Sequence, residues 1–318
     1  MFMKILVIYI CIIGGIESAD WYGNIVNSTV NINGNDSEGI GCSNWIGNVI
    51  NCDFKIKGDY SSNIRVVKWK GGIFNSHFSS TGYSSSDVLT YSTWKGNVIN
   101  SIFKGKEKFS SCITPLKWEG SILNSKIICE GRYSTGIAST IWKGNLLNST
   151  VSTYGKDSTP VSCGHRWTGK ITNCKINVYS SKSKSTFNNW HSGILIPYGK
   201  GLISNSSIKQ HNGYAVVVHN NIKVKNCELT SQKGFKKIHL CRSDLVITKV
   251  KKSGRNYYVT IENKGEFDSY PCYLVFKTNH IFKKIKVDVQ YVNFNGPETF
   301  KIMLPAKYVN KYYSNMLK

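Results

Sequence analysis

Alternating apolar and polar positions predict short β-strands between about residues 20 and 230, and the alternation recurs in one repeated phrase. In all seven copies Trp is followed two residues later by Gly, then by an aliphatic residue, an Asn, and a Ser or Cys. The phrase returns every 24 or 25 residues, beginning at Trp21, Trp45, Trp69, Trp94, Trp118, Trp142 and Trp167. A repeat of this length without a helical apolar period predicts one coil of strands and turns per repeat, as in a β-solenoid.

Counting each Trp as position 0 separates inward columns from outward ones. Position 4 is always aliphatic and position 9 always apolar, as at Ile25 and Val30 in the first repeat. Position 8 varies between polar, charged and, at Ile102, apolar residues, which is typical of a solvent-facing site under two-residue alternation. Position 7 is always Ser or Cys, small enough to face inward.

The tryptophans share a strand face with Gly at position 2 and the aliphatic residue at position 4, so we expect a buried ladder of indoles. The alternative, an exposed stripe on which sugars stack, stays open at this point. Tyrosines in the variable half of the coils are better candidates for an exposed aromatic surface. They are Tyr60, Tyr83, Tyr91, Tyr133, Tyr154 and Tyr179.

Position 6 is Asn in all seven repeats: Asn27, Asn51, Asn75, Asn100, Asn124, Asn148 and Asn173. Asn tolerates the left-handed backbone region and suits a sharp corner between two strands. With coils stacked about 4.8 Å apart, each amide can bond the next, and we expect the ladder to be buried. On these residues, the chain resembles right-handed parallel β-helix proteins over roughly residues 20–240. Burial would leave Asn35 as the plausible acceptor among the glycosylation sequons at Asn27, Asn35, Asn148 and Asn205.

Two weaker phrases, at 201–208 and 221–229, place further corner residues at Asn205 and Asn226 and bring the count to about nine coils. Such a stack would be on the order of 40 Å long. The stretch 182–200 carries about eight extra residues, which in a solenoid form a loop on one face, often the binding face.

From residue 244 the phrase is absent, and five short strand patterns predict a small β-sandwich of Ig-like type. They span 245–252, 257–263, 270–277, 282–292 and 299–304. Their order resembles the CARDB domain of bacterial and archaeal surface proteins. Cys272 within a strand and a shortened turn at 295–297 depart from that pattern.

The first 19 residues read as a secretory signal peptide, with Lys4, an apolar core at 5–16 and cleavage near Ser18 or Ala19. A retained, uncleaved anchor stays an alternative because Glu17 is atypical. We see no second apolar run of membrane-spanning length. The expected organisation is a leader at 1–19, a parallel β-helix at 20–242, a CARDB-like sandwich at 243–308 and a tail at 309–318.

A formal net charge of +23, from 41 Lys and Arg against 18 Asp and Glu, predicts attraction to polyanions. Residues 158–227 contain no carboxylate and many cations, so we expect anion binding there. The candidate residues are Arg166, Lys170, Lys175, Lys182, Lys184, Lys200 and Lys209. Acidic glycans or cell-wall polymers fit a secreted protein; specific nucleic-acid binding is not expected, because no groove-reading motif is present. Surface lysines that merely solvate the rod stay an equal alternative.

Nine cysteines follow the leader: Cys42, Cys52, Cys112, Cys129, Cys163, Cys174, Cys227, Cys241 and Cys272. The odd number leaves at least one free thiol or an intermolecular bond, and the pairing stays open. Three of them occupy position 7 in distant coils, and we expect these to be buried small residues. No Cys or His ligand spacing is present, so we expect no metal site, and no cofactor is predicted.

Polysaccharide lyases and hydrolases share this architecture, and an enzyme acting on an acidic polysaccharide is the alternative function. Such sites need clustered carboxylates, but Asp36 and Glu38 form the one close pair. His191, His211 and His219 are candidates for proton transfer, although ordinary surface roles are the simpler interpretation. We therefore predict no catalytic residues. The rod, leader and CARDB-like domain together resemble the adhesin-like surface proteins of methanogenic archaea, which implies a secreted or cell-surface adhesin that contacts glycans and possibly other cells.

Overall fold

The computed structural model describes residues 16–179, 192–211, 213–219, 221–231, 237–241, 245–253, 256–263, 274–277, 282–285 and 298–303. The chain divides into two compact units, Met1–Leu240 and Cys241–Lys318. Over the described residues, all regular elements are β-strands. That part of the chain holds no apolar helix of membrane-spanning length.

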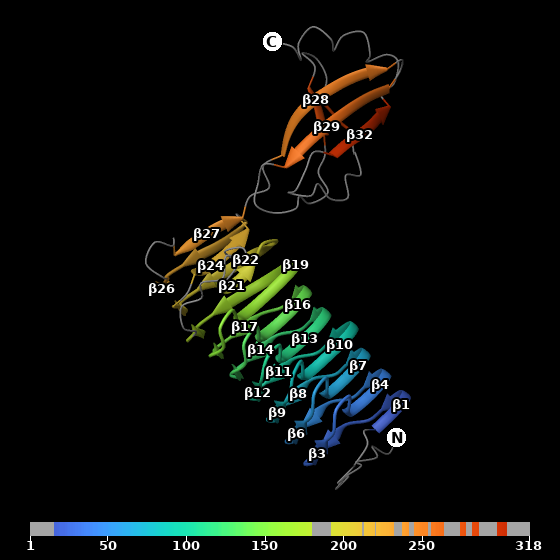
Figure 1. The fold of residues 1–318 in the computed structure, drawn as a ribbon, viewed down its shortest axis with the longest axis vertical. Helices are drawn as coiled ribbons and strands as arrows, with labels where there is room; N and C mark the ends of the chain where they lie inside the picture. The colour runs from blue at the N-terminus through green and yellow to red at the C-terminus, as the bar shows by residue number, and fades with distance from the viewer. Residues whose placement is uncertain are drawn as a thin grey trace. The chain divides into compact units, whose positions relative to one another are not determined.

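Each turn of the first unit consists of three strands. β4 (Glu38–Ile46) leads into β5 (Val49–Ile50) and β6 (Asp53–Lys57), after which β7 (Ser62–Lys70) pairs in parallel with β4. The first two strand types join one 18-stranded sheet, and the third type forms a nine-stranded sheet (Figure 1). The unit is therefore a right-handed parallel β-solenoid of about eight turns, which confirms the predicted architecture; the sequence count of about nine corresponds to the strands of the smaller sheet.

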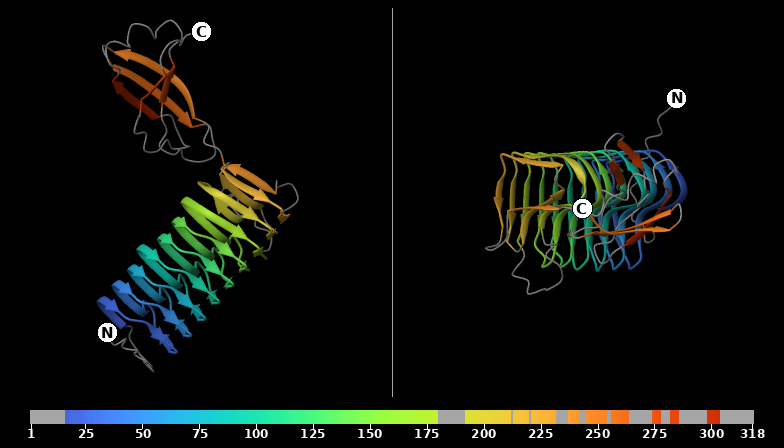
Figure 2. Two further views of the ribbon diagram at one scale, coloured as in Figure 1. Left: turned by 180° about the vertical axis from the view of Figure 1, so that it is seen from behind. Right: turned by 90° about the horizontal axis from the view of Figure 1, so that it is seen from above.

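The strands recur in a fixed order, and Figure 2 shows the stacked coils from two further sides. The strands that begin each turn are β1 (Ile16–Tyr22), β4, β7, β10 (Ser86–Lys95), β13 (Ser111–Glu119), β16 (Thr135–Lys143), β19 (Thr159–Thr172), β21 (Ser192–Ile196), β24 (Tyr214–His219) and β27 (Ile238–Cys241). β19 also continues into the place of the middle strand, where it pairs with β17. The middle strands are β2 (Ile25–Val26), β5, β8 (Ile73–Phe74), β11 (Val98–Ile99), β14 (Ile122–Leu123), β17 (Leu146–Leu147), β22 (Gly199–Ser204) and β25 (Ile222–Lys225). The nine-stranded sheet contains β3 (Thr29–Asn33), β6, β9 (His77–Thr81), β12 (Ile102–Lys106), β15 (Lys126–Cys129), β18 (Thr150–Thr153), β20 (Lys175–Val178), β23 (Ser207–Gln210) and β26 (Glu228–Thr230).

The tryptophans form a buried ladder, as predicted. From Trp45 to Trp167 each indole is at most 2% exposed. Ring centroids of successive indoles from Trp21 to Trp142 lie 4.6–5.1 Å apart with planes within 7° of parallel, whereas Trp167 is tilted by 50°. The columns at positions 4 and 9 are also buried, and Phe54, Phe78 and Phe103 stack in the latter. The alternative of an exposed tryptophan platform for sugars is therefore wrong.

The glycine at position 2 is explained by the close approach of neighbouring coils. The Trp118 indole N–H donates to the Gly96 carbonyl at 2.9 Å, and the same bond recurs at 2.8–3.3 Å for the tryptophans from Trp45 to Trp167. A Cβ on Gly96 would lie 1.8 Å from the carbonyl oxygen of Gly71. Only glycine leaves room for coils to stack with this bond in place.

The asparagine corner forms as predicted, with φ between 48° and 55° at all nine positions, including Asn205 and Asn226. Side-chain amides bond between coils at 3.1–3.2 Å, from Asn51 to Asn27, from Asn100 to Asn75 and from Asn173 to Asn148. The expectation of burial is wrong, because all nine side chains are exposed. At this corner the side chains stand outside the coil, so burial does not exclude glycosylation at Asn27, Asn148 or Asn205.

Serines at position 7 line the inner side of the same corner. The backbone N–H of Ser76 donates to the Ser101 hydroxyl on the next coil at 3.1 Å, and the Ser101 hydroxyl donates to the carbonyl of Ile99 at 2.8 Å. Cys52 and Cys174 are buried in this column, as predicted, whereas Cys227 is only half-buried. Position 7 thus joins coils through hydrogen bonds while filling little volume.

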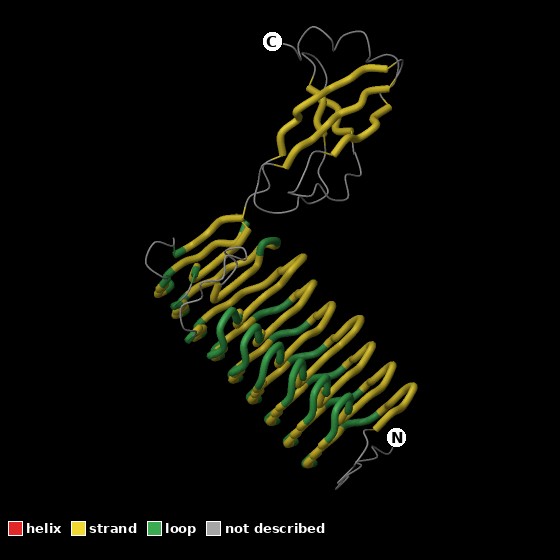
Figure 3. Tube along the Cα trace, viewed as in Figure 1, coloured by secondary structure: helices red, strands yellow, loops and turns green. Residues whose placement is uncertain are grey.

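A second corner, not predicted from the sequence, lies at position 15. Its residues have φ between 53° and 60°: Asp36, Tyr60, Ser84, Phe109, Tyr133 and Asp157. The next position is Ser in every one of these coils, and the Ser61, Ser85, Ser110, Ser134 and Ser158 side chains are at most 1% exposed. Figure 3 shows loops at matching places in successive coils. The invariant Ser was the available signal for this corner.

The predicted leader falls mainly on residues outside the described ones. β1 nevertheless begins at Ile16, inside the predicted leader, and its backbone pairs with β4 in register, Ile16 with Ile40 and Ser18 with Cys42.

The second unit contains an antiparallel sheet in the order β28 (Leu245–Ser253), β29 (Asn256–Asn263), β32 (Glu298–Met303). β30 (Leu274–Lys277) and β31 (Phe282–Ile285) form an antiparallel pair. These strands fall within the predicted strand patterns, apart from one or two terminal residues. The Ig-like sandwich itself stays a prediction.

Candidate functional site

A row of exposed charged residues on the first unit flanks the buried tryptophans. Because each indole points inward, the residues at positions −1 and +1 point outward on the same strand. In-register pairing then aligns these outward residues from coil to coil. For example, Lys95 pairs with Lys70 on one side and with Glu119 on the other.

Seven cations occupy these two columns over successive strands from β7 to β22, and all seven are exposed. We call them the basic strip: Lys68, Lys70, Lys95, Lys117, Lys143, Arg166 and Lys200. Neighbouring coils are about 4.8 Å apart and the two columns roughly 7 Å apart. Six coils contribute, so the strip extends over about 24 Å.

One carboxylate interrupts the basic strip. Glu119 lies between two lysines, with its oxygens 3.3 Å from Lys143 Nζ and 3.4 Å from Lys95 Nζ. Hydrogen bonds from Lys143 and Lys95 lower the pKa of Glu119 below its ordinary value. Spacings within the strip are shorter than the Debye length of about 8 Å at physiological salt, so neighbouring cations reinforce one another at its surface.

The residues predicted to bind anions are divided between two faces. Arg166 and Lys200 belong to the basic strip, and Lys170 lies in β19, three residues after Trp167. Lys175 and Lys209 lie on the nine-stranded sheet, where Lys209 is paired with Glu228 at 3.2 Å. Lys182 and Lys184 lie outside the described residues. The structure therefore gathers two of the predicted residues with five that sequence reasoning missed.

A row of aromatic side chains runs along the second corner. The ring centroids of Tyr60, Tyr83, Phe109 and Tyr133 follow one another at 5.0–5.5 Å, and Tyr154 stacks on Tyr179 at 4.6 Å. All six predicted tyrosines, Tyr91 among them, are exposed, between 39% and 52%, which confirms that prediction. In the parallel pairs the ring faces cover one another, so these rings offer edges rather than open faces for sugar stacking.

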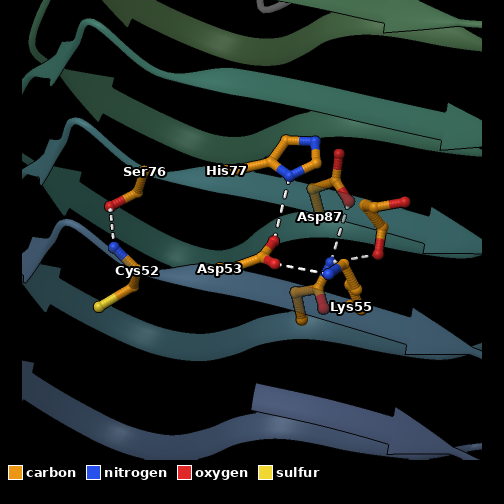
Figure 4. Close-up of polar contacts among 8 residues, drawn as sticks. Cys52, Asp53, Lys55, Ser76, His77 and Asp87 are labelled. Atoms are coloured by element: carbon orange, nitrogen blue, oxygen red, sulfur yellow. Dashed lines mark hydrogen bonds and ion pairs between the residues drawn. The ribbon is translucent and has the colours of Figure 1, made fainter. Parts of the chain in front are cut away.

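The nearest approach to an acid–base arrangement lies on the nine-stranded sheet. Figure 4 shows Asp53 between Lys55 and His77, with Oδ2 2.6 Å from Lys55 Nζ and Oδ1 3.1 Å from His77 Nδ1. Asp53 and His77 line an open groove of about 440 Å³ together with several of the corner asparagines. Asp53 is the only carboxylate lining this groove, whereas glycosidic hydrolysis commonly uses two.

The other acid–base candidates do not gather at one place. Glu38 is bound by Arg65 at 2.8 Å, and His211 stacks against Tyr179 at a centroid distance of 6.2 Å. His219 accepts a hydrogen bond from the backbone N–H of Asn221 at 3.3 Å, and burial lowers its pKa. His191 lies outside the described residues. Within the described ranges, no three His, Cys, Asp or Glu side chains converge as metal ligands would.

Comparison with known proteins adds no relative: no protein-family model, no curated protein and no solved structure matches this chain.

Proposed function

We propose that this protein is a secreted or cell-surface, adhesin-like binding protein that holds an anionic glycan or cell-wall polymer along its basic strip, without catalysis. The observation that carries the proposal is the alignment of seven exposed cations on consecutive coils. One carboxylate interrupts them, that of Glu119, which is ion-paired with Lys95 and Lys143. Such alignment creates a continuous positive field, which attracts polyanions from solution.

A polymer fits the basic strip better than a small anion. The cations are spread over about 24 Å along the stacking direction, so one carboxylate or phosphate reaches only one or two of them. A chain bearing a charge on each sugar can contact many at once, and the contacts then act together. The stacked backbone holds the lysine Cα positions fixed, which reduces the ordering cost to that of the side chains.

Secretion and a CARDB-like second unit are parts of the proposal that rest on the sequence. The leader pattern at 1–19 supports secretion, and the strand patterns after residue 244 support a CARDB-like sandwich of the kind found in archaeal and bacterial surface proteins. Attachment through such a domain would place the basic strip at a cell exterior, where acidic polymers are the available polyanions.

The test is retention on immobilised polygalacturonate, with neutral dextran as the reference matrix, over a series of salt concentrations. Replacing Lys68, Lys70 and Lys117 by Gln removes three strip charges while leaving the partners of Glu119 in place. The matched control replaces Lys57, Lys106 and Lys126, which are exposed on the nine-stranded sheet, and so loses the same charge.

We expect the strip variant to elute at clearly lower salt than both the wild type and the control variant. Equal elution of the two variants would show that only net charge matters and would refute a localised site. Tighter retention on double-stranded DNA than on the glycan, with the same variant pattern, would instead identify nucleic acid as the ligand.

The enzymatic alternative rests on the Asp53 and His77 pair beside the groove. Incubation with polygalacturonate, followed by measurement of reducing ends and of unsaturated uronate absorbance, tests it directly. Product that disappears in a His77→Gln variant would replace the binding proposal with a lyase or hydrolase.

A further inference from the structure

Two cysteine thiols face each other inside the solenoid. Cys112 lies in β13 and Cys129 ends β15, and their Sγ atoms are 3.0 Å apart. Both side chains are 0% exposed. The two residues come from consecutive repeats, with Cys112 at position 18 of one and Cys129 at position 11 of the next.

The space for this contact is created by a glycine. Gly105 is the in-register partner of Cys129 on the neighbouring coil, so no side chain occupies the site beside Cys129 there. A Cβ on Gly105 would lie 3.5 Å from Cys112 Sγ, in ordinary contact, so a longer side chain at this position would compete with the thiol for space. The local sequence therefore brings the two sulfurs together within the core.

Other buried cysteines have different surroundings. Cys52 and Cys174 replace serine at position 7, and each thiol donates to the carbonyl two residues earlier, at 3.2 Å. Cys163 donates to the carbonyl of Thr140 at 3.7 Å. Cys112 and Cys129 also lie 3.4 Å from backbone carbonyls, those of Ile128 and Thr135, but they differ in that their two sulfurs contact each other.

We propose that Cys112 and Cys129 form a disulfide bond that joins two consecutive coils covalently. The two thiols lose two protons and two electrons, one S–S bond forms, and the electrons reduce a disulfide oxidant such as oxidised glutathione to two thiols. The link encloses a short loop, and in a solenoid whose coils contact only their neighbours it would hold two adjacent units together when the ends open.

The bond forms before the two coils close. Both sulfurs are buried in the folded chain, and burial raises the pKa of the Cys112 thiol well above its ordinary value, which suppresses the reactive thiolate. Oxidation therefore occurs in the partly folded protein, where the thiols are still accessible. A reducing compartment would leave the pair as two thiols, so the proposal concerns refolding under oxidising conditions and is independent of what the basic strip binds.

The experiment maps the bond in the full chain. Protein unfolded with reductant is refolded in a mixture of oxidised and reduced glutathione, alkylated with iodoacetamide in denaturant, and digested with trypsin without reduction. Cleavage places Cys112 in the peptide 109–117 and Cys129 in 127–132, each with a single cysteine. We expect these peptides as one linked species, about 2 Da lighter than their summed masses and separated by reductant.

Recovery of both peptides individually alkylated from refolded protein would overturn the proposal, as would linkage of either peptide to another cysteine. Refolding is checked by the fluorescence of the buried tryptophans. The control is Cys163→Ala, which should retain the linked species. A thermal scan gives a second measurement: reduction should lower the unfolding temperature of wild type and of Cys163→Ala, but should not lower that of a folded Cys112→Ala variant by the same amount.

Discussion

Asp87 should make the solenoid less stable as the pH rises from acid to neutral. Its side chain (Figure 4) lies in β10 at 0% exposure. The Asn63 amide donates to its Oδ1 at 3.0 Å. Burial raises the pKa of Asp87 from 3.8 to about 8, and the nearby Ser80 hydroxyl, Asn63 amide and Cys112 thiol offset this only in part. At neutral pH the folded protein therefore holds a proton that the unfolded chain has released.

The direction and size of this pH effect on stability follow from the linkage between proton binding and folding. Below about pH 4 the carboxyl is protonated in both states, and its full contribution to stability is present. As the pH rises towards 8, only the unfolded chain ionises, so the free energy of unfolding falls by at most about 1.4 kcal/mol per pH unit. The shift in the Asp87 pKa corresponds to a loss on the order of 5 kcal/mol in the free energy of unfolding. The loss levels off above the pKa of Asp87 in the folded protein.

The assay is urea unfolding followed by tryptophan fluorescence between pH 4.5 and 8.5, since the indole ladder reports on coil stacking. Asp87→Asn keeps the shape and the acceptor oxygen but has no ionisable proton, so this component of the pH dependence should disappear. At pH 8 the variant should be more stable than wild type by up to several kcal/mol. Asp36→Asn, at an exposed corner residue, is the control and should retain the wild-type slope. The same slope in Asp87→Asn and wild type, or a variant less stable than wild type at pH 8, would refute the reasoning.

Two further predictions concern the contacts between coils. Gly96→Ala should lower the free energy of unfolding by several kcal/mol or prevent folding, because its Cβ would meet the Gly71 carbonyl. Gly164→Ala should be tolerated, because a Cβ there meets nothing within 4 Å. Thermal unfolding followed by circular dichroism compares the two variants, and equal melting temperatures would contradict the steric account. Ser101→Ala should lower the free energy of unfolding in urea by about 1–3 kcal/mol, because it leaves the Ser76 N–H unpaired, and Ser101→Cys should lower it less. An alanine variant as stable as wild type would show that the position-7 serines contribute little to stability.

The inward columns could be predicted because each constrains one residue type at a fixed step. Trp45 and its counterparts share a face with Gly and an aliphatic residue, and alternation alone then sends them into the core. The prediction that the corner asparagines are buried was wrong for a physical reason. A residue such as Asn100, with φ of 53°, turns the chain and leaves its amide outside the coil, so an invariant polar residue was mistaken for a buried one.

The second corner and the basic strip escaped prediction for different reasons. Residues with left-handed φ at position 15 include Tyr60 and Phe109, types that do not mark a turn, so the backbone conformation there comes from stacking rather than from local preference. The basic strip gathers one or two residues from each of six coils. Lys68 and Lys117 lie far from the carboxylate-poor stretch in sequence, and only the register of the strands brings them into line with Arg166.

The two repeats of 25 residues show how the array absorbs an irregular length. In β10 the register shifts between Thr90 and Thr93, and opposite β16 the shift falls between Cys163 and Arg166, so each extra residue bulges just before the tryptophan. The indole that follows is back in phase with the coil before it. Gene duplication or deletion of one module would therefore preserve every inward column and would lengthen or shorten the stack by a single coil.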